Sequence, residues 1–351
     1  SPEGIAALQA AKPLAEKKRE AMAKAVSVSE RAKIDLSAEY RHPMPFTDCA
    51  DVPDNAYPDG DIADKAIAHL QVLKDKPFFF AVGFLKPHLP FAAPKKYWDM
   101  YTRSQCAPSA VKDWPKGMPP IAGSNWGELL GYANGAKANE PDVARQLIHG
   151  YCAATSYVDA QIGRVIDGLD RLGLRGNTVI ILWGDHGWKL GEYGAWCKHT
   201  NFELDAHAPL ILDAPGCTQG RRTQALVEFV DIYPTLADLC GLPVPAACEG
   251  TSMVPLLNDP KRAWKAAAFS QYPRKGDQVM GYTMRTKDWR YTEWIDRKTR
   301  QVVARELYDH RLPGMELVNL ADDPTHAGTV TKLSAQLAGG SGWKAVAKGV
   351  N

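Results

Sequence analysis

Two segments of the chain place polar side chains directly after apolar runs. The first run, Thr178 to Trp183, continues as Gly184-Asp-His-Gly187 and then as Trp188-Lys-Leu-Gly-Glu-Tyr-Gly-Ala-Trp-Cys-Lys198. The second run, Pro77 to Gly83, continues as Phe84-Leu-Lys-Pro-His-Leu-Pro-Phe91. A carboxylate beside an imidazole, with a lysine further along, has the chemistry of a site for a metal ion or an anion.

Each of these residues also has a purely structural interpretation. The Asp185-His186 pair could cap a helix that follows a strand. Lys198 could be a solvated loop lysine and His88 a turn histidine, and Lys86 could simply support its Pro-flanked turn. Two apolar runs that each lead to a lysine and a histidine favour a shared site over these separate interpretations, because ligand sites of open α/β sheets gather at the carboxyl edge.

The elements around these segments must place the polar residues at one sheet edge. Apolar runs rich in β-branched and aromatic residues predict buried strands. Helical spacing of apolar residues, with Pro at starts and Gly at ends, predicts the helices between them. The predicted strands are 78–83, 178–183 and 209–212, and the predicted helices are 1–40, 61–75, 95–101, 143–172 and 230–240.

This alternation of strand and helix predicts an α/β fold with a mostly parallel sheet flanked by helices. After about Lys261 residues of different character alternate along the chain with a period of two. This predicts antiparallel strands at 266–271, 282–285 and 289–294. The predicted organisation is therefore a helical segment 1–48, an α/β domain 49–258 and a small antiparallel subdomain 259–351. Trp183 and Trp289 lie in strand patterns and are predicted to be core residues.

Composition narrows the class of protein. The chain has 351 residues, 45% hydrophobic and 23% charged, with a net charge of +2, so its charge gives no argument for a nucleic-acid partner. No apolar run approaches the roughly 20 residues of a membrane span, and residues 1–30 do not resemble a signal peptide. Among the seven cysteines, Cys240 and Cys248 flank a turn and could form a disulfide in an oxidising compartment.

The two polar motifs resemble the sulfatase family of the alkaline-phosphatase-like superfamily, and within it the iduronate-2-sulfatase-like members. The resemblance extends over roughly residues 48–325 and implies the α/β fold of that superfamily. The matching segments are Pro77–Phe91, Asp185–Lys198, Asn201-Phe202, His207–Leu210, Leu226–Leu236, Met280–Thr292 and Glu306–Asp309.

The resemblance also implies roles for individual residues. Asp185 and His186 would belong to a calcium site, although His186 could instead donate a hydrogen bond to a sulfate oxygen. Lys198 and His88 would contact the sulfate, with His88 as the acid that protonates the leaving oxygen. The remaining expected substrate contacts are Lys86, Trp188 and Tyr193.

One departure from the family pattern concerns the nucleophile. Sulfatases carry it near the N-terminus in a Cys/Ser-x-Pro/Ala-x-Arg motif, where it is oxidised to formylglycine, together with an Asp-Asp pair. Neither feature precedes Lys86, and Cys106-Ala-Pro-Ser-Ala110 lacks the arginine and lies downstream of His88. We therefore expect this chain to be the C-terminal portion of a sulfatase, without activity on its own, with the formylglycine in the missing part.

The resemblance implies a hydrolase of sulfate esters that acts on a sulfated sugar such as a 2-O-sulfated uronate. Two alternatives stay open: a phosphodiesterase or phosphonate hydrolase of the same superfamily, and an inactive sulfatase-like binding protein. The family implies a periplasmic, secreted or lysosome-like location. The sequence gives no prediction of oligomeric state.

Overall fold

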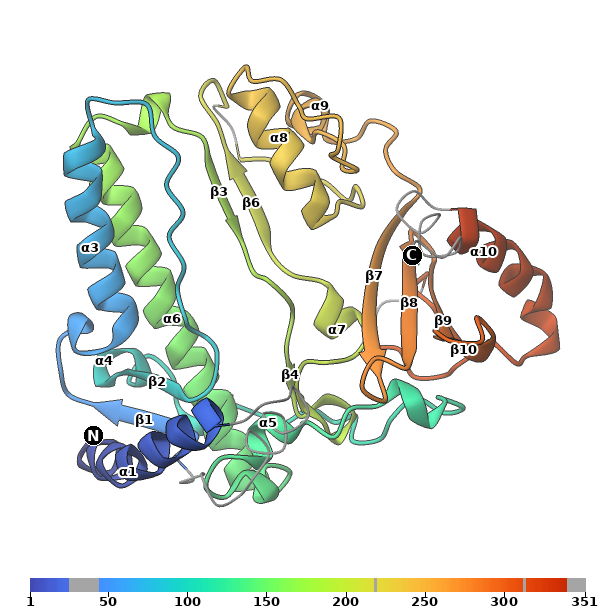
Figure 1. The fold of residues 1–351 in the computed structure, drawn as a ribbon, viewed down its shortest axis with the longest axis horizontal. Helices are drawn as coiled ribbons and strands as arrows, with labels where there is room; N and C mark the ends of the chain where they lie inside the picture. Colours follow the sequence, from blue (N-terminus) through green and yellow to red (C-terminus); the bar gives the residue numbers. More distant parts are fainter. Residues whose placement is uncertain (25–43, 218–219, 312–313, 340–351) are drawn as a thin grey trace. The chain divides into compact units, whose positions relative to one another are not determined.

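The computed structural model describes residues 1–24, 44–217, 220–311 and 314–339 (Figure 1). The chain divides into two compact units. Unit 1 comprises Ser1–Lys112, Trp126–Arg175 and Leu190–Cys197, and unit 2 comprises Asp113–Asn125, Gly176–Lys189 and Lys198–Asn351. The chain crosses from one unit to the other several times, so each unit is built from segments far apart in the sequence. None of the described helices is long and apolar enough to cross a membrane.

Unit 1 is organised around two long helices that lie side by side (Figure 1). Helix α6 (Pro141–Arg171) begins at a proline, as the sequence predicts, and packs against α3 (Pro58–Leu73). Strands β1 (Thr47–Ala50) and β2 (Phe91–Pro94) pair in parallel and contact α6. The other described elements of this unit are α1 (Pro2–Lys24), α4 (Lys95–Trp98), α5 (Gly127–Leu130) and β5 (Trp196–Cys197).

Close packing in unit 1 depends on small residues and buried hydrogen bonds. A Cβ added at Gly150 of α6 would lie 2.9 Å from the side chains of Phe91 and Thr47, so the two strands approach the helix where it has no side chain. Near the start of α3, the Gly60 N–H donates to the hydroxyl of the buried Tyr157 of α6 at 2.6 Å. These contacts fix the start of α3, where Asp59 binds the backbone of the Lys86–His88 turn.

Unit 2 contains a two-stranded sheet and a four-stranded sheet. Strand β3 (Ile180–Trp183) pairs with β6 (Leu210–Asp213), and Ile181 and Leu210 pack with α8 (Ile232–Leu239) and α9 (Val254–Asn258). The larger sheet is antiparallel with strand order β10-β9-β8-β7. Its strands are β7 (Ala267–Arg274), β8 (Val279–Thr286), β9 (Trp289–Asp296) and β10 (Val302–Asp309).

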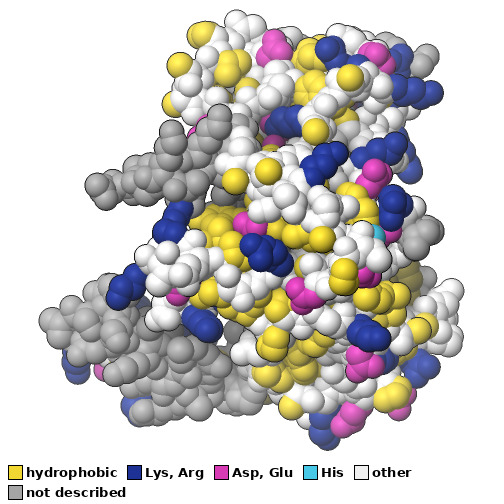
Figure 2. All heavy atoms as spheres, turned by 90° about the vertical axis from the view of Figure 1, so that its right-hand side faces the viewer, with side chains coloured by type: hydrophobic (Ala, Val, Ile, Leu, Met, Phe, Trp, Pro, Cys, Tyr) yellow, Lys and Arg dark blue, Asp and Glu magenta, His cyan; other side chains and the backbone are white. Residues whose placement is uncertain are grey.

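The core of the antiparallel sheet lies under helix α10 (Ala327–Gly339). Leu333 and Leu337 of α10 pack on Met284, Tyr291 and Leu307, all of which are buried. The remaining short elements are α7 (Glu203–Ala206) in unit 2 and β4 (Lys189–Leu190), which lies where the chain passes between the units. Charged side chains of both signs are interspersed over the face drawn in Figure 2, in keeping with the net charge of +2.

Most predicted elements are present, with shifted ends. Gly173 follows α6 at a φ of +69°, as expected for a glycine that ends a helix. The N-terminal helix is described over Pro2–Lys24, and the rest of its predicted range, residues 25–40, lies outside the described residues. The three predicted antiparallel strands are confirmed as β7, β8 and β9, and the sequence analysis missed β10.

The predicted parallel sheet is not confirmed. The 78–83 segment forms no strand, and Phe79 is 84% exposed. Strand β3 is present, but it pairs antiparallel with β6, and Trp183 is 47% exposed rather than in the core. An apolar run shows that a segment can be buried in a sheet, but it carries no information about the direction of its partner. Cys240 and Cys248 are free thiols in this structure.

Candidate active site

The Lys86–His88 turn of unit 1 is held by a buried carboxylate. Asp59, near the start of α3, is 1% exposed, and its two oxygens accept the backbone N–H groups of Leu85 and Lys86, each at 2.9 Å. Hydrogen bonds from backbone N–H groups to an ionised carboxylate are among the stronger ones in proteins. Asp59 therefore fixes the backbone just before His88, and the sequence analysis did not single it out.

Lys86 folds back over its own turn. Its Nζ donates to the carbonyl oxygens of His88 at 3.1 Å and Pro90 at 2.8 Å. Burial lowers the pKa of the Lys86 ammonium from its ordinary value. These contacts are those of a residue that supports the turn, and substrate binding by Lys86 stays a prediction.

His88 presents its ring between a carbonyl and a carboxylate. Nδ1 lies 2.7 Å from the Leu89 carbonyl oxygen, and Nε2 lies 2.6 Å from Oε1 of Glu128 in α5. The His88 side chain is 45% exposed and that of Glu128 is 21% exposed. The ring is therefore oriented through both nitrogens and still reaches the surface, as a residue that exchanges a proton requires.

In unit 2 the structure brings four predicted site residues into one cluster. Nε2 of His186 lies 3.5 Å from Oδ1 of Asp185, and the His186 ring stacks on the Trp188 ring with centroids 6.0 Å apart. The Lys198 Nζ lies 4.6 Å from the centroid of the Trp188 ring. Trp188 thus links His186 to Lys198, although Lys198 follows it by ten positions in the sequence.

The donor set of Asp185 and His186 fits part of the shell of a divalent cation. His186 Nδ1 lies 2.8 Å from the Gly187 carbonyl oxygen, so Nε2 is the ring atom beside the Asp185 carboxylate. Asp185 is 84% exposed and its oxygens face solvent. Ca²⁺ takes about six to eight oxygen ligands. Asp185 can supply only a minority of them, and the His186 ring nitrogen is a less usual ligand for this ion.

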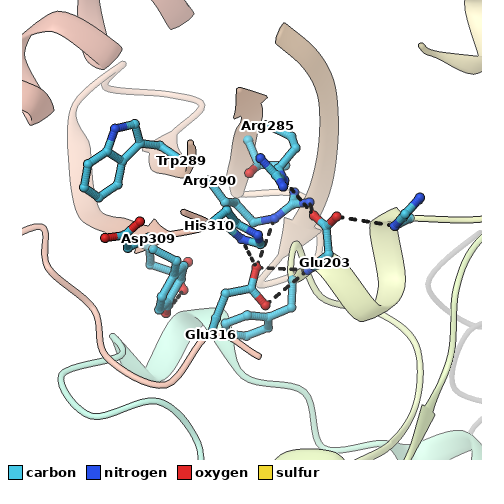
Figure 3. Close-up of polar contacts among 12 residues, drawn as sticks. Glu203, Arg285, Trp289, Arg290, Asp309, His310 and Glu316 are labelled. Carbon is cyan, nitrogen blue, oxygen red and sulfur yellow. Dashed lines mark hydrogen bonds and ion pairs between the residues drawn. The ribbon is translucent and has the colours of Figure 1, made fainter. Parts of the chain in front are cut away.

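A second group with metal-ligating side chains lies elsewhere in unit 2. One ligand atom from each of Glu203, His310 and Glu316 lies within 4.8 Å of the others. Figure 3 shows that two arginines already occupy these carboxylates. Arg290 forms ion pairs with Glu203 and with Glu316 at 3.1 Å, and Arg285 pairs with Glu203 at 3.1 Å. Because two guanidinium charges balance two carboxylates, this group is better suited to an ion-pair network than to a metal.

The network fixes the first residue of α7. Glu203 donates its backbone N–H to Oε1 of the buried Glu316 at 3.1 Å. Although burial raises the pKa of the Glu203 carboxyl, the hydrogen bond from His207 and the charge of Arg290 hold it well below its usual range. The same hydrogen bond raises the pKa of His207. This network could not be predicted from the sequence, because its members come from segments that share no local pattern.

Asp205 of α7 ties the two ends of the Asp185–Thr200 segment together. Its side chain forms a buried ion pair with Lys189 and accepts the backbone N–H of Thr200 at 2.8 Å. Its carbonyl oxygen accepts the Gly187 N–H at 2.8 Å. A Cβ at Gly187 would lie 1.9 Å from the Leu204 carbonyl oxygen, which explains why the residue after Asp185-His186 must be glycine.

Tyr193 and Cys106 are buried in unit 1. Tyr193 is 2% exposed at a φ of +59°, and its N–H donates to the Val111 carbonyl oxygen at 3.0 Å. Contact between Tyr193 and a substrate stays a prediction. Cys106 is 3% exposed, and its thiol donates to the Thr102 carbonyl oxygen at 3.5 Å.

The predicted site residues are divided between the two units. Unit 1 carries Lys86, His88 and Tyr193, and unit 2 carries Asp185, His186, Trp188 and Lys198. The convergence of the two groups on one substrate stays a prediction.

Comparison with known proteins gives two family matches and several relatives. The Sulfatase model matches residues 33–242, and the model of the C-terminal part of N-sulphoglucosamine sulphohydrolase matches residues 191–341. Iduronate 2-sulfatase of Mus musculus is 32% identical, over 82% of this chain and 66% of that protein. The Homo sapiens protein of the same name is 33% identical, over 71% of this chain and 58% of its own length. The chain therefore spans between half and two thirds of the length of these relatives.

Solved structures confirm the superfamily fold. The phosphonate monoester hydrolase SpPMH from Silicibacter pomeroyi superposes with a TM-score of 0.68 at 25% identity, covering 82% of this chain and 60% of that chain. BT4656, solved in complex with its substrate D-glucosamine-2-N,6-O-disulfate, gives 0.67 at 22% identity, covering 81% and 69%. Both are structures of the α/β superfamily that the motifs predict, although the described sheets of this chain are small and mostly antiparallel.

Proposed function

Because this chain belongs to the sulfatase family, we propose that it contributes Lys198, His88 and Asp185 to the hydrolysis of sulfate esters. The observation that carries the proposal is the cluster in which Lys198 lies over the Trp188 ring, next to His186 and Asp185. A cation held on an aromatic ring beside a carboxylate–imidazole pair is arranged to receive a tetrahedral oxyanion.

The proposed roles follow from the chemistry of each group. Lys198 neutralises charge on the sulfate near the leaving oxygen. His88, oriented by Leu89 and Glu128, protonates that oxygen as the ester bond breaks. Trp188 keeps the Lys198 ammonium in place and offers an apolar face to a sugar ring.

Asp185 and His186 are the residues that would hold a divalent cation such as Ca²⁺. When bound, such an ion polarises the sulfate oxygens and stabilises negative charge in the transition state. In the alternative role, His186 donates Nε2–H to a sulfate oxygen. We place the formylglycine nucleophile and the other metal carboxylates in a part of the protein outside this sequence, since the 351 residues contain no Cys/Ser-x-Pro/Ala-x-Arg motif.

We propose a sulfated sugar as the substrate, with a 2-O-sulfated uronate as the first choice. The similarity to two iduronate 2-sulfatases supports this choice. A uronate also carries a carboxylate, whose charge could be balanced by cationic and imidazole side chains. These are Lys86, His88, His186 and Lys198. A protein of this kind would work in a periplasmic, secreted or lysosome-like compartment.

Hydrolysis of a phosphonate monoester or a phosphate diester is the second candidate. The similarity to the phosphonate monoester hydrolase SpPMH at 25% identity favours it, and the same oxyanion chemistry would apply. A sulfatase-like binding protein without turnover is the third candidate, and it is the expected behaviour of this chain by itself.

The test supplies the family's N-terminal part to this chain and compares substrates. We expect the completed protein to hydrolyse a uronate 2-sulfate disaccharide with a kcat/KM at least about tenfold above that for a neutral-sugar sulfate, since a hydrogen bond to a charged group is worth about 1.5–3 kcal/mol. Equal values would overturn the uronate assignment alone. Preference for a phosphate diester or phosphonate would overturn the proposal that the protein is a sulfatase. Absence of all turnover would favour the third candidate, a sulfatase-like binding protein.

The matched control separates the role of Lys198 from a general loss of charge. Lys198→Ala should abolish most of the turnover, whereas Lys65→Ala on the exposed face of α3 should not, because Lys65 only pairs with Asp61 at the surface. Both variants should keep the same melting temperature within a few degrees.

A further inference from the structure

Arg274, the last residue of β7, spreads its guanidinium over a set of backbone carbonyl oxygens in unit 2. Nε donates to Ile121 at 2.9 Å, and Nη1 donates to Pro273 at 3.0 Å. Nη2 is shared among the carbonyl oxygens of Ala122 at 3.2 Å, Gly123 at 3.1 Å and His199 at 2.7 Å. The shortest of these bonds goes to the residue that directly follows Lys198.

Aromatic rings hold the guanidinium at this position. The Arg274 Cζ lies 4.7 Å from the centroid of the Tyr272 ring and 5.3 Å from that of Trp294. The His199 ring also stacks on Tyr272, with centroids 5.5 Å apart. His199 is therefore bound to the end of β7 through both its carbonyl oxygen and its ring.

His199 has a backbone conformation that needs external support. Its φ is +83°, in the left-handed region, where an L-residue other than glycine costs about 1–2 kcal/mol. Such a conformation persists only where the surroundings hold it, and it is often found at functional sites. The hydrogen bond from Arg274 to the His199 carbonyl oxygen supplies that support.

The residues after His199 are held by other elements. The Thr200 N–H donates to Asp205, and the Asn201 side chain donates to the Gly281 carbonyl oxygen of β8 at 3.1 Å. Three consecutive residues are thus anchored by β7, α7 and β8 in turn. Of these anchors, Arg274 is the one adjacent to Lys198.

We propose that Arg274 is a positioning residue for Lys198. It fixes the left-handed backbone at His199 and so sets the direction from which the Lys198 side chain reaches the Trp188 ring. The role in catalysis rests on the function proposed above, whereas the control of backbone geometry does not. Arg274 itself touches backbone and aromatic rings, so it acts on the sulfate only through Lys198.

The planar shape of the guanidinium is essential to this role. Arginine presents five N–H donors in a fixed fork, whereas lysine presents one ammonium on a flexible stem. Burial lowers the pKa of Arg274 from its ordinary value, but arginine stays protonated in proteins. Arg274→Lys therefore keeps the charge and loses most of the carbonyl contacts, which separates geometry from electrostatics.

The first experiment measures amide hydrogen exchange in this chain, with Arg274→Lys as the test variant and Arg305→Lys as the control. Arg305 lies on β10 of the same sheet, is 45% exposed and pairs with Glu293. We expect exchange of the Thr200 amide to accelerate at least about tenfold in Arg274→Lys, because a loosened segment opens at a lower free energy. Exchange in β8 and β9 should not change. Unchanged exchange at Thr200 would overturn the positioning role, whatever the protein's activity.

The second experiment uses kinetics of the completed protein. Arg274→Lys should lower kcat by about 10–100-fold with a smaller effect on KM, as expected when a group reaches the transition state from the wrong direction. In Arg274→Ala, added guanidinium ions should restore part of kcat, but they should not restore it in Lys198→Ala. If kcat in Arg274→Lys matches the Arg305→Lys control, Arg274 has only a structural role. If the wild type fails to cleave any sulfate ester, the proposed function fails, and the exchange experiment still decides the positioning role.

Discussion

The Lys86–His88 turn and the Lys198–Asn201 segment carry the same kinds of side chain but are held in different ways. Asp59 binds the first turn from 26 and 27 positions away, and Lys86 closes it from within. The second segment is held by Arg274 and Gly281, which lie 75 and 80 positions from their partners. Glu316 holds the start of α7 just after this segment, 113 positions from its partner Glu203. The antiparallel sheet therefore supports the Lys198–Asn201 segment, and the loop after β10 supports the start of α7.

This difference predicts where damage should spread. Changes at the first turn should remain local, because its contacts come from the start of α3, from Glu128 of α5 and from within the turn itself. Changes in the contacts that hold the second segment should also alter the Asp185–Thr200 segment, because Asp205 binds both of its ends.

Breaking the buried ion pair between Lys189 and Asp205 should have the largest effect on stability. Lys189 is 0% exposed and Asp205 4% exposed, so Lys189→Met would leave a buried carboxylate without its partner charge. We expect the free energy of unfolding to fall by about 3–5 kcal/mol. Urea denaturation measures this change, and Lys189→Met/Asp205→Asn should recover part of it. A double variant as unstable as the sum of both single variants would argue against the pairing.

Gly187→Ala should disturb the same loop through its backbone. The new Cβ would lie 1.9 Å from the Leu204 carbonyl oxygen, so α7 must move. We expect a loss of about 2–3 kcal/mol, the upper part of the roughly 1–3 kcal/mol range that is usual for overpacking. Gly163→Ala is the matched control, because a Cβ in that part of α6 meets nothing within 4 Å. The control should be neutral or slightly stabilising, and a similar loss in both variants would contradict the account.

The sheet that supports Lys198 should weaken as the pH rises. Burial raises the pKa of Glu306 to about 7, although Trp294 and Tyr308 donate hydrogen bonds to it at 2.7 Å. Since the folded state binds its proton more tightly than the unfolded state, this contribution to stability is present below about pH 4.5 and is lost as the pH rises to about 7.

Glu306→Gln tests this pH dependence. The amide cannot ionise, so the variant should be more stable than the wild type at pH 8 by about 1–3 kcal/mol and should lose the decline between pH 4.5 and 7. Thermal unfolding at several pH values measures it, with the exposed Glu249→Gln as control. A wild-type stability that rises over this range in step with Glu306→Gln would rule out the raised pKa.

The smallest effect is expected at the first turn. Asp59→Asn keeps one acceptor and loses the other together with the charge, so about 1–2 kcal/mol should be lost. Hydrogen exchange should quicken at Leu85 and Lys86 and stay unchanged in the four-stranded sheet. Faster exchange in β8 would show that the two regions are coupled more strongly than proposed here.

The motifs and helices could be predicted from the sequence more fully than the long-range contacts that hold them in place. Helix α6 could be found because its apolar spacing and the flanking Pro141 and Gly173 are local signals. The direction of β3 could not, because an apolar run does not specify whether its partner is parallel. Arg274 and Glu316 were missed because a long-range polar contact leaves no periodic trace in the chain.

The same distinction applies to the candidate site. The proximity of Asp185, His186 and Trp188 follows from their adjacency in sequence, whereas the contact of Lys198 with Trp188 depends on the turn between them. The burial of Tyr193 could not be predicted from its place in a Gly-rich segment. It depends on how residues 111–112 pack against that turn, as the hydrogen bond to Val111 shows.

One measurement tests most directly whether the two regions act on one substrate. It is the double-mutant cycle of His88→Ala and Lys198→Ala in the completed protein, read as kcat/KM for a uronate 2-sulfate. Each single change should cost about 10²–10⁴-fold. If both residues serve the same sulfate ester, the double variant should be little slower than the slower single variant, because residues that act as a unit are not additive. Fully multiplicative losses, or an effect of only one of the two changes, would contradict the account.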